Sequence, residues 1–327
     1  MTTLSVLDLV PVREGETLPS AYTAAVSLAQ TAETHGYDRF WVAEHHAMEG
    51  LAGAATSVVL AHIGNATDTI RIGSGGIMLP NHNPFVIAEQ FGTLDALFPG
   101  RIDLGLGRAP GADARFGQAL RKNIGQAAEY FPQDVIELRA LLTGDINLPI
   151  KATPGYGSQV EIWMLGSSLF GAGLAAKLGM PYAFASHFAP DHLDAALELY
   201  RRDFTPSEYL DRPHVMAAMT VIAADTDDDA DYIASSQWQA FVRLRSGMPG
   251  RLPPPLADYR SSLPAPAKAM LAHIGQASAI GSPETVKSAL GNFIERTQAD
   301  EIIVAGSTFD PEHRNRSLEV TRAVLAA

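Results

Sequence analysis

The sequence contains no cysteine among its 327 residues. Disulfides, thiolate metal sites and thiol nucleophiles are therefore excluded as sources of stability or chemistry. A small scaffold held together by disulfides, as many secreted domains are, is excluded as well, and a cytoplasmic location is the expectation.

Charged residues are also few, and basic ones are in the minority. Only 18% of the residues are charged, and 24 Lys and Arg stand against 36 Asp and Glu, which gives a net charge of -12. A nucleic-acid surface would need a basic stripe, so the composition argues against nucleic acid as a partner. No run of about 18 uninterrupted apolar residues occurs, and the N-terminus lacks a basic segment followed by an apolar one. We therefore expect no membrane span and no signal peptide.

What the sequence does contain is an alternation of apolar strands with helical segments. The expected strands cover residues 4–10, 39–43, 70–74, 101–106, 161–165, 182–186, 215–223 and 301–305. In a chain somewhat longer than about 250 residues, this alternation predicts one (β/α)8 TIM barrel with insertions, a single α/β domain over residues 1–327. The alternative, an open doubly wound sheet, would need a glycine fingerprint after its first strand, where the sequence has VPVR instead.

Residues 70–111 show this pattern most clearly. An apolar strand is followed by Gly75-Gly76. Two glycines allow the backbone to adopt unusual conformations or to lie close to another group. Asn83 is a plausible N-cap and Pro84 stands at the first position of a helix that residues 98–100 end. Elsewhere in the chain, Gly144 and Gly179 are expected to end helices and Thr226 to cap one. A βαβ unit whose strands end in glycine leaves open space at its carboxyl edge.

Four segments are expected to lie outside this regular alternation. Residues 109–123 predict a loop, residues 127–142 one helix, and residues 145–159 an insertion packed outside the core. The many prolines between residues 247 and 266 predict a long mobile or irregular loop that could close over the site as a lid.

In a barrel the active site gathers at the carboxyl ends of the strands. The polar residues expected at those ends are Asp8, Glu44, His45, His46, Arg108, Ser167, Ser168, Ser186 and His187. Together they define the region in which chemistry is expected.

Arg108 is the strongest candidate for binding an anion. A fixed cation among glycines suits a phosphate, and Ser167 and Ser168 add hydroxyls and free backbone N–H groups at the start of a helix. The alternative interpretation is that Arg108 pairs with a nearby acid and Ser168 only caps the helix.

Glu44-His45-His46 allows three interpretations. In the first, one histidine only packs at a strand end; in the second, the triplet contributes metal ligands; in the third, a histidine acts as a general acid or base. Adjacent strand residues face opposite ways, so only part of the triplet can meet one ion. A barrel hydrolase of the amidohydrolase kind would also want His-x-His at the end of strand one, where the sequence has LDL. His82, His187, Trp163 and Trp238 could line a substrate pocket.

Several motifs occur together along the chain. They are Gly75-Gly76 after the third strand, the loop LPNHNP, the run FPGR followed by GLGR, the segment FWVAEHH, and residues 163–179. This combination resembles the bacterial-luciferase-like flavin-dependent monooxygenases, over roughly the first 190 residues.

The resemblance implies a cofactor and roles for single residues. Reduced FMN would bind with its phosphate at Arg108, Ser167 and Ser168, above a bulge at Gly75 and Gly76 that often carries a non-prolyl cis peptide in the family. His45 would be the catalytic histidine, and we place Glu44, His82 and His187 on the substrate side. Luciferase proper has an acidic residue and a threonine where this chain has Ser167 and Gly171.

The resemblance also implies partners and a reaction. An NAD(P)H-dependent flavin reductase would supply the reduced FMN, and O2 would form a C4a-peroxyflavin that oxidises a small organic substrate, for example an aldehyde. The family often forms homodimers through its second and third helices, and the weakly charged residues 50–66 are consistent with such an interface.

Three alternatives stay open. They are a deazaflavin-dependent hydride-transfer enzyme of the same superfamily, a metal-assisted hydrolase, and a noncatalytic flavin-storing or structural subunit. The presence of both His45 and Arg108 weighs against the last.

Overall fold

The computed structural model describes residues 2–109, 114–120, 123–144 and 149–326. The strands are β1 (Thr3–Asp8), β2 (Arg39–Val42), β3 (Arg71–Met78), β4 (Ile102–Gly107), β5 (Glu161–Gly166), β6 (Tyr182–Phe184), β7 (Val215–Ala223), β8 (Ser278–Gly281) and β9 (Glu301–Ala305). The α-helices are α1 (Leu18–Thr34), α2 (Thr56–Gly64), α3 (Pro84–Leu97), α4 (Ala114–Ala119), α5 (Ile124–Glu129), α6 (Phe131–Thr143), α7 (Leu169–Leu178), α8 (Leu193–Arg202), α9 (Asp227–Arg245), α10 (Tyr259–Ser262), α11 (Ala265–Ile274), α12 (Pro283–Thr297) and α13 (Pro311–Ala326). Short 3-10 turns are η1 (Leu79–Asn81), η2 (Pro190–His192) and η3 (Gly275–Ala277).

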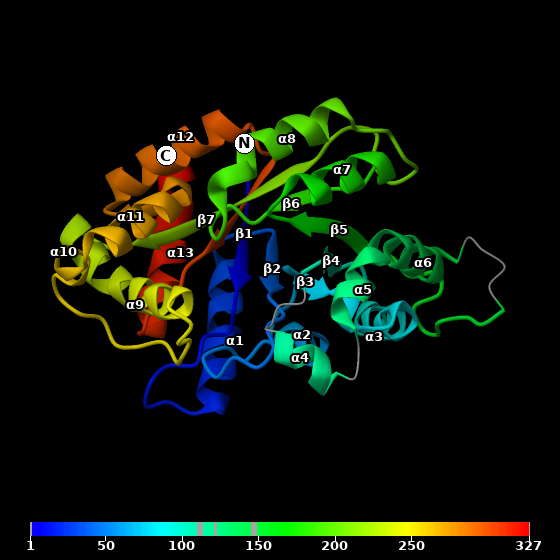
Figure 1. The fold of residues 1–327 in the computed structure, drawn as a ribbon, viewed down its shortest axis with the longest axis horizontal. Helices are drawn as coiled ribbons and strands as arrows, with labels where there is room; N and C mark the ends of the chain where they lie inside the picture. Colours follow the sequence, from blue (N-terminus) through cyan, green and yellow to red (C-terminus); the bar gives the residue numbers. More distant parts are fainter. Residues whose placement is uncertain (1, 110–113, 121–122, 145–148, 327) are drawn as a thin grey trace.

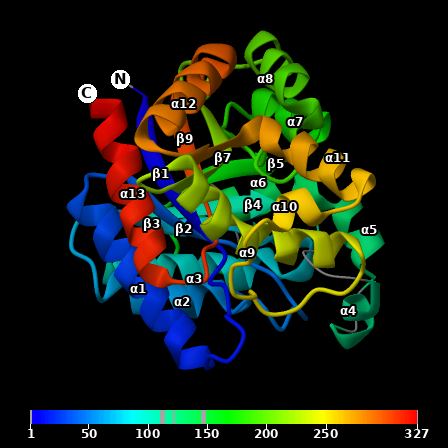
Figure 2. The same cartoon turned by 90° about the vertical axis from the view of Figure 1, so that its left-hand side faces the viewer.

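The strands close into a ring of parallel pairs. The order runs from β1 through β7 and returns by way of β9, which pairs with both β7 and β1. Helices surround this ring, as Figures 1 and 2 show from two directions. The predicted (β/α)8 TIM barrel is therefore confirmed, with β9 as its eighth strand.

β8 is an addition to the barrel that the sequence did not predict. It pairs with Thr220–Ala223, the last residues of β7, beyond the part of β7 that pairs with β6. Its four residues are too few for a periodicity to be visible. With α9, α10 and α11 it forms an insertion between β7 and the helix α12 that leads to β9.

Two apolar layers hold the barrel together. Inside the ring, a small cluster is built around Trp41, Trp163, Met216 and Ile303. Outside it, a much larger cluster lies between the strands and the surrounding helices. All nine residues of β7 are buried, as expected of a strand covered on both faces.

β3 is longer than predicted, because it continues through Gly75-Gly76 to Met78 instead of ending at Ser74. Its pairing with β4 shifts register between Ser74 and Ile77, and the Gly75–Gly76 peptide bond is cis. The bulge and cis peptide expected at this position are confirmed. A Cβ on Gly75 would lie 2.6 Å from a methyl carbon of Leu7.

The ends of several helices form as predicted. The side chain of Asn83 accepts a hydrogen bond from the backbone N–H of Phe85, and Pro84 is the first helical residue of α3. Gly144 and Gly179 end α6 and α7 in the left-handed conformation. Thr226 caps α9, where its side chain accepts from the N–H of Asp229.

The region between β4 and β5 is more helical than predicted. α4 lies within the predicted loop, and α5 and α6 replace the single helix expected over residues 127–142. Of the predicted insertion, residues 145–148 lie outside the described residues. The remainder packs closely on α3, because a Cβ on Gly92 would lie 2.0 Å from the Cα of Gly155.

The proline-rich segment over residues 247–266 is largely irregular, as predicted, but its first part is held in place. The N–H of Leu252 donates to the carbonyl of Val12, and its own carbonyl accepts from the N–H of Glu14, both at 2.8 Å. Arg251 forms an ion pair with Glu49 at 2.9 Å. The segment therefore lies against the loops that follow β1 and β2. Among the described residues, no helix has both the length and the apolar character that crossing a membrane requires.

Candidate active site at the carboxyl end of the barrel

Two histidines follow strands on opposite sides of the ring, and each has a buried ring nitrogen without a hydrogen-bond partner among the described residues. His45 follows β2 and His187 follows β6, and the Nδ1 atom of each is buried with no hydrogen-bond partner among the described residues. Burial lowers the pKa of His45. Burial, with the charge of His45 as a further cause, lowers the pKa of His187 to about 4. Both rings are therefore neutral near pH 7 and have a nitrogen free to hold or accept a proton.

Glu44 is the centre of a second cluster. It is fully buried, and its Oε1 atom lies 2.5 Å from Nε2 of His46 and 2.8 Å from Nε2 of His82. Its Oε2 atom accepts from the N–H of Met78 at 3.1 Å. Burial alone would raise the pKa of Glu44, but these hydrogen bonds lower it to about 2. The carboxylate is thus ionised and ties the loop after β2 to the end of β3.

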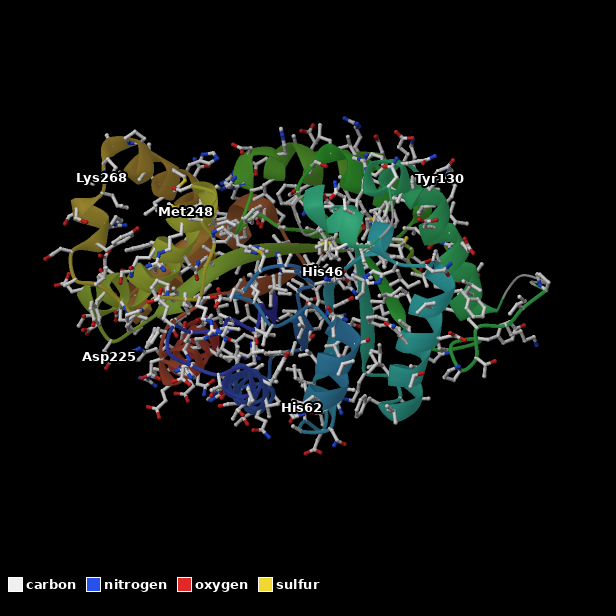
Figure 3. All side chains as sticks on the ribbon, turned by 60° about the horizontal axis from the view of Figure 1, so that its bottom comes forward. His46, His62, Tyr130, Asp225, Met248 and Lys268 are labelled. Carbon is white, nitrogen blue, oxygen red and sulfur yellow. The ribbon has the colours of Figure 1, made fainter. Side chains whose placement is uncertain are left out.

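The three side chains of this cluster also form the kind of donor set that binds metal ions. The ligand atoms of Glu44, His46 and His82 lie within 4.8 Å of one another. His45, which lies between Glu44 and His46 in the sequence, is not part of this donor set. His46 also stacks on Phe116 of α4, with ring centroids 4.4 Å apart. In Figure 3, which brings the lower side of Figure 1 forward, His46 lies near the middle of the molecule.

Arg108 lies directly after β4 and is exposed. Its guanidinium carbon lies 4.1 Å from the centroid of the Phe170 ring, and its Nε donates to the carbonyl of Ala128 at 3.3 Å. Within the described part of the chain, no carboxylate forms an ion pair with it. Its alternative interpretation, a partner for a nearby acid, therefore finds no support in these residues, and the terminal nitrogens remain available for an anion.

The fold places Ser167 and Ser168 close to Arg108. Both are exposed just before α7, and Phe170, which supports Arg108, is in the first turn of that helix. Ser168 occupies the N-cap position, but its side chain makes no capping hydrogen bond. The alternative interpretation, in which Ser168 only caps the helix, therefore finds no support in this geometry. A cation, two hydroxyls and a helix N-terminus lie side by side.

Other polar residues predicted at the strand ends serve the framework. Asp8 accepts from Arg314 at 2.7 Å and from the N–H of Val10 at 2.9 Å, so it links β1 to α13. The hydroxyl of Ser186 donates to the carbonyl of Ala218 and links the end of β6 to β7.

A cavity of about 1160 Å³ lies away from these groups, between α9, α10, α11 and β8, and Trp238, Phe241 and Leu271 contribute to its wall. Of the residues expected to line a substrate pocket, Trp238 lines this cavity, whereas His82, Trp163 and His187 do not.

Two aromatic supports of the site were not predicted from the sequence. Phe116 stands in a segment with no motif, Phe170 lies in the motif segment 163–179 without being singled out, and only the fold brings them to His46 and Arg108. A possible signal was the position of Phe170 two residues after Ser168, because the first turn of a helix faces the group that its N-terminus binds.

Comparison with known proteins decides the family. The model of the family described as "Luciferase-like monooxygenase" matches residues 2–301. The chain belongs to this family. A luciferase-like monooxygenase from Escherichia coli (strain K12) is 47% identical over 321 residues, which cover 98% of this chain and 96% of the relative. Family membership identifies the chain as an oxidoreductase.

Solved structures of luciferase-like proteins share the fold. Apo-MsnO8 superposes with a TM-score of 0.93 at 33% identity and covers 100% of this chain, with 99% of its own chain covered. At 16% identity, where only the fold is comparable, the oxygenating constituent of 3,6-diketocamphane monooxygenase was solved in complex with FMN (TM-score 0.71, 98% and 97% covered). An F420-dependent secondary alcohol dehydrogenase, also 16% identical, was solved with an F420-acetone adduct (TM-score 0.69, 99% and 98% covered). Luciferase-like neighbours therefore bind either FMN or a deazaflavin.

One relative whose name states an activity is more distant. It is the N-acetyl-S-alkylcysteine monooxygenase of Bacillus subtilis (strain 168), 36% identical over 254 residues, which cover 76% of this chain and 75% of the relative.

Proposed function

We propose that this protein is a flavin-dependent monooxygenase that uses reduced FMN and O2 to oxidise a small organic substrate. The observation that carries the proposal is Arg108, a cation supported by Phe170 beside Ser167 and Ser168, with no carboxylate partner among the described residues. This donor set suits a phosphate, and the buried Nδ1 atoms of two neutral histidines suit proton handling next to it. The residues present therefore fit the cofactor.

Each side chain then has a task. Arg108, Ser167 and Ser168 would hold the FMN phosphate. Gly75 and Gly76 would lie next to the ring system of the flavin. His45 would hold or move a proton at Nδ1, and His187 and His82 would lie on the substrate side. When bound, reduced FMN supplies the electrons with which one atom of O2 enters the substrate and the other leaves as water.

Glu44 takes a different role from the one predicted. It is buried, and both of its carboxylate oxygens accept hydrogen bonds from protein groups. The geometry thus favours a positioning role over direct contact with substrate. It fixes His46 and His82 and also the N–H of Met78, two residues after Gly76 in the bulge.

The substrate class and the partners belong to the same proposal. An aldehyde is the substrate that the family resemblance implies. The N-acetyl-S-alkylcysteine monooxygenase of Bacillus subtilis supports thioethers as a second candidate class of substrate. A separate NAD(P)H-dependent flavin reductase would supply reduced FMN. The cytoplasmic location stays a prediction.

A homodimer is supported by the surface of α2 and α3. Val58 is 67% exposed on α2, and on α3 Val86 is 44% and Leu97 59% exposed. Exposed apolar side chains on two adjacent helices are typical of an interface between subunits. Sedimentation of the wild type and of a Val58→Asp variant tests this, with a dimer expected for the first and a shift toward monomer for the second.

The cofactor is tested by anaerobic titration with reduced FMN and, in parallel, with the reduced deazaflavin. We expect FMN to bind and Arg108→Ala to weaken it by about 1.5–3 kcal/mol, the scale of a hydrogen bond to a charged group. Arg139→Ala is the control, because Arg139 lies over Tyr209 in the same way but on another part of the surface.

The outcomes separate the alternatives. An unchanged titration for Arg108→Ala would remove Arg108 from the phosphate site. Binding of the deazaflavin alone would move the protein to hydride transfer. Binding of neither, together with a metal ion bound at Glu44, His46 and His82, would favour the metal-assisted hydrolase.

A further inference from the structure

A second arginine with aromatic support lies in the insertion after β7. The guanidinium carbon of Arg245, at the end of α9, lies 5.0 Å from the ring centroids of both Phe188 and Phe241. The two rings are 6.2 Å apart at an angle of 72°, so they form a corner that holds the guanidinium. Phe188 remains 44% exposed. An arginine on aromatic faces keeps its planar donor edge free for a ligand.

The charge of Arg245 is uncompensated, unlike that of its neighbour on the helix. Arg243 forms an ion pair with Glu14 at 2.7 Å. For Arg245, the described residues provide no carboxylate at ion-pair distance and no hydrogen-bond acceptor. In a protein with a net charge of -12, an exposed cation without an acidic partner is an available site for an anion.

Arg245 also lies at the end of the barrel where the chemistry is expected. Phe188 follows His187 directly in the chain after β6. The N–H of Ser307, which follows β9, donates to the side chain of Gln237 on α9, so this part of the helix lies beside the carboxyl end of β9.

We propose that Arg245, supported by Phe188 and Phe241, binds an anionic group of the substrate, and that the substrate is a small organic carboxylate. Because Phe188 is joined to His187, a carboxylate at Arg245 leaves the rest of the molecule directed toward the two histidines. Arg108 is then the cation for the cofactor and Arg245 the cation for the substrate. This inference rests on the proposed function and adds the substrate class to it.

The carboxylate would be recognised by geometry as well as by charge. A guanidinium presents two parallel N–H donors that match the two oxygens of a carboxylate, and such charge-assisted pairs are about twice as strong as neutral hydrogen bonds. A neutral amide of the same size can use only one acceptor there. The site therefore favours an acid over the corresponding amide.

The test compares matched probe pairs on the protein loaded with oxidised FMN. The pairs are N-acetyl-S-methylcysteine and its carboxamide, and 3-phenylpropanoate and 3-phenylpropanamide. Calorimetry measures the affinity of each probe for the wild type, Arg245→Gln, Arg245→Lys and the control Arg243→Gln. We expect at least one acid to bind the wild type about tenfold or more tightly than its amide, the scale of a charge-assisted hydrogen bond.

The variants decide whether Arg245 causes that preference. Arg245→Gln should bring the ratio of acid to amide affinity close to one, Arg245→Lys should retain part of it, and Arg243→Gln should keep it. A wild-type ratio near one for both pairs, or an unchanged ratio in Arg245→Gln, overturns the inference. The FMN affinity is measured in the same proteins and should not change. A failure of FMN to bind the wild type refutes the proposed function instead, so the two failures are distinguishable.

Discussion

At the amino end of the barrel, charged side chains point inward and pair with one another, whereas at the carboxyl end several polar groups are left without partners. Arg39, at the start of β2, lies 2.8 Å from Asp103, 3.2 Å from Glu161 and 3.3 Å from Glu301. Arg71 pairs with both Asp103 and Glu161. Each of these residues stands at or next to the first position of its strand.

The carboxyl end has the opposite character. Arg108 and Arg245 are held on phenyl rings without a carboxylate partner in the described part of the chain, and His45 and His187 keep buried ring nitrogens unused. The two histidine nitrogens gain nothing for folding, since a buried unpaired polar atom costs free energy, and the two arginines form no ion pair that would stabilise the fold. The comparison indicates that the amino end supplies stability and the carboxyl end supplies ligand binding and chemistry, as in other barrels.

The largest effect is expected from breaking the amino-end network. Asp103 is fully buried and also accepts from the indole N–H of Trp41 at 2.9 Å. Asp103→Ala should lower the free energy of unfolding by about 3–5 kcal/mol, because it removes the buried carboxylate that Arg39 and Arg71 share and leaves the indole N–H of Trp41 without its acceptor. Urea denaturation measures this. Asp194→Ala removes the exposed pair with Arg296 and should cost no more than about 1 kcal/mol; equal effects of the two changes would contradict the comparison.

A change at His45 should affect turnover and not stability. His45→Ala removes a side chain whose Nδ1 has no partner among the described residues, so flavin affinity should stay nearly unchanged. Turnover should fall by about 100-fold or more, the usual contribution of a positioned acid or base. Single-turnover kinetics with reduced FMN and O2 measure the rate, and flavin titration measures the affinity. Loss of flavin binding would show that His45 is a structural residue.

The fold and its local geometry could be predicted from the sequence better than the contacts at the two ends of the barrel. The alternation of strands and helices was enough to predict the barrel, and Gly75-Gly76, Asn83-Pro84 and Gly179 predicted local geometry correctly, because each depends on residues close in sequence. The strand-end rule also placed His45 and His187 at the same end of the barrel.

The contacts that determine the site depend on strand order and register instead. Arg39, Asp103 and Glu301 come together only because β2, β4 and β9 are bent around one axis, although a charge at the start of an apolar strand was visible in each case. The support of Arg108 by Phe170 joins two motif segments that are far apart in the sequence, and neither motif indicates that the two side chains meet.

A smaller effect is expected from pH. Burial and the charge of His45 lower the folded-state pKa of His187 to about 4, below the value of about 6.5 in an unfolded chain. Between these values the unfolded state binds a proton that the folded state does not. Stability from this group is therefore complete above about pH 6.5 and falls as the pH drops toward 4, by up to about 1.4 kcal/mol per pH unit. Urea denaturation from pH 7.5 to 4.5 should show a shallower loss for His187→Gln; parallel curves would contradict the assignment.

The smallest effect is expected at Ser168, and it separates capping from ligand binding. Thr226 and Ser168 hold the same N-cap position in α9 and α7, but only Thr226 accepts a hydrogen bond from its helix. Thr226→Ala should therefore lower the free energy of unfolding by about 1 kcal/mol, while Ser168→Ala should change it by less than about 0.5 kcal/mol. Flavin affinity should respond in the reverse order, because the Ser168 hydroxyl is free for the phosphate beside Arg108. A loss of stability in Ser168→Ala with unchanged flavin affinity would place Ser168 in the framework and confine the phosphate site to Arg108 and Ser167.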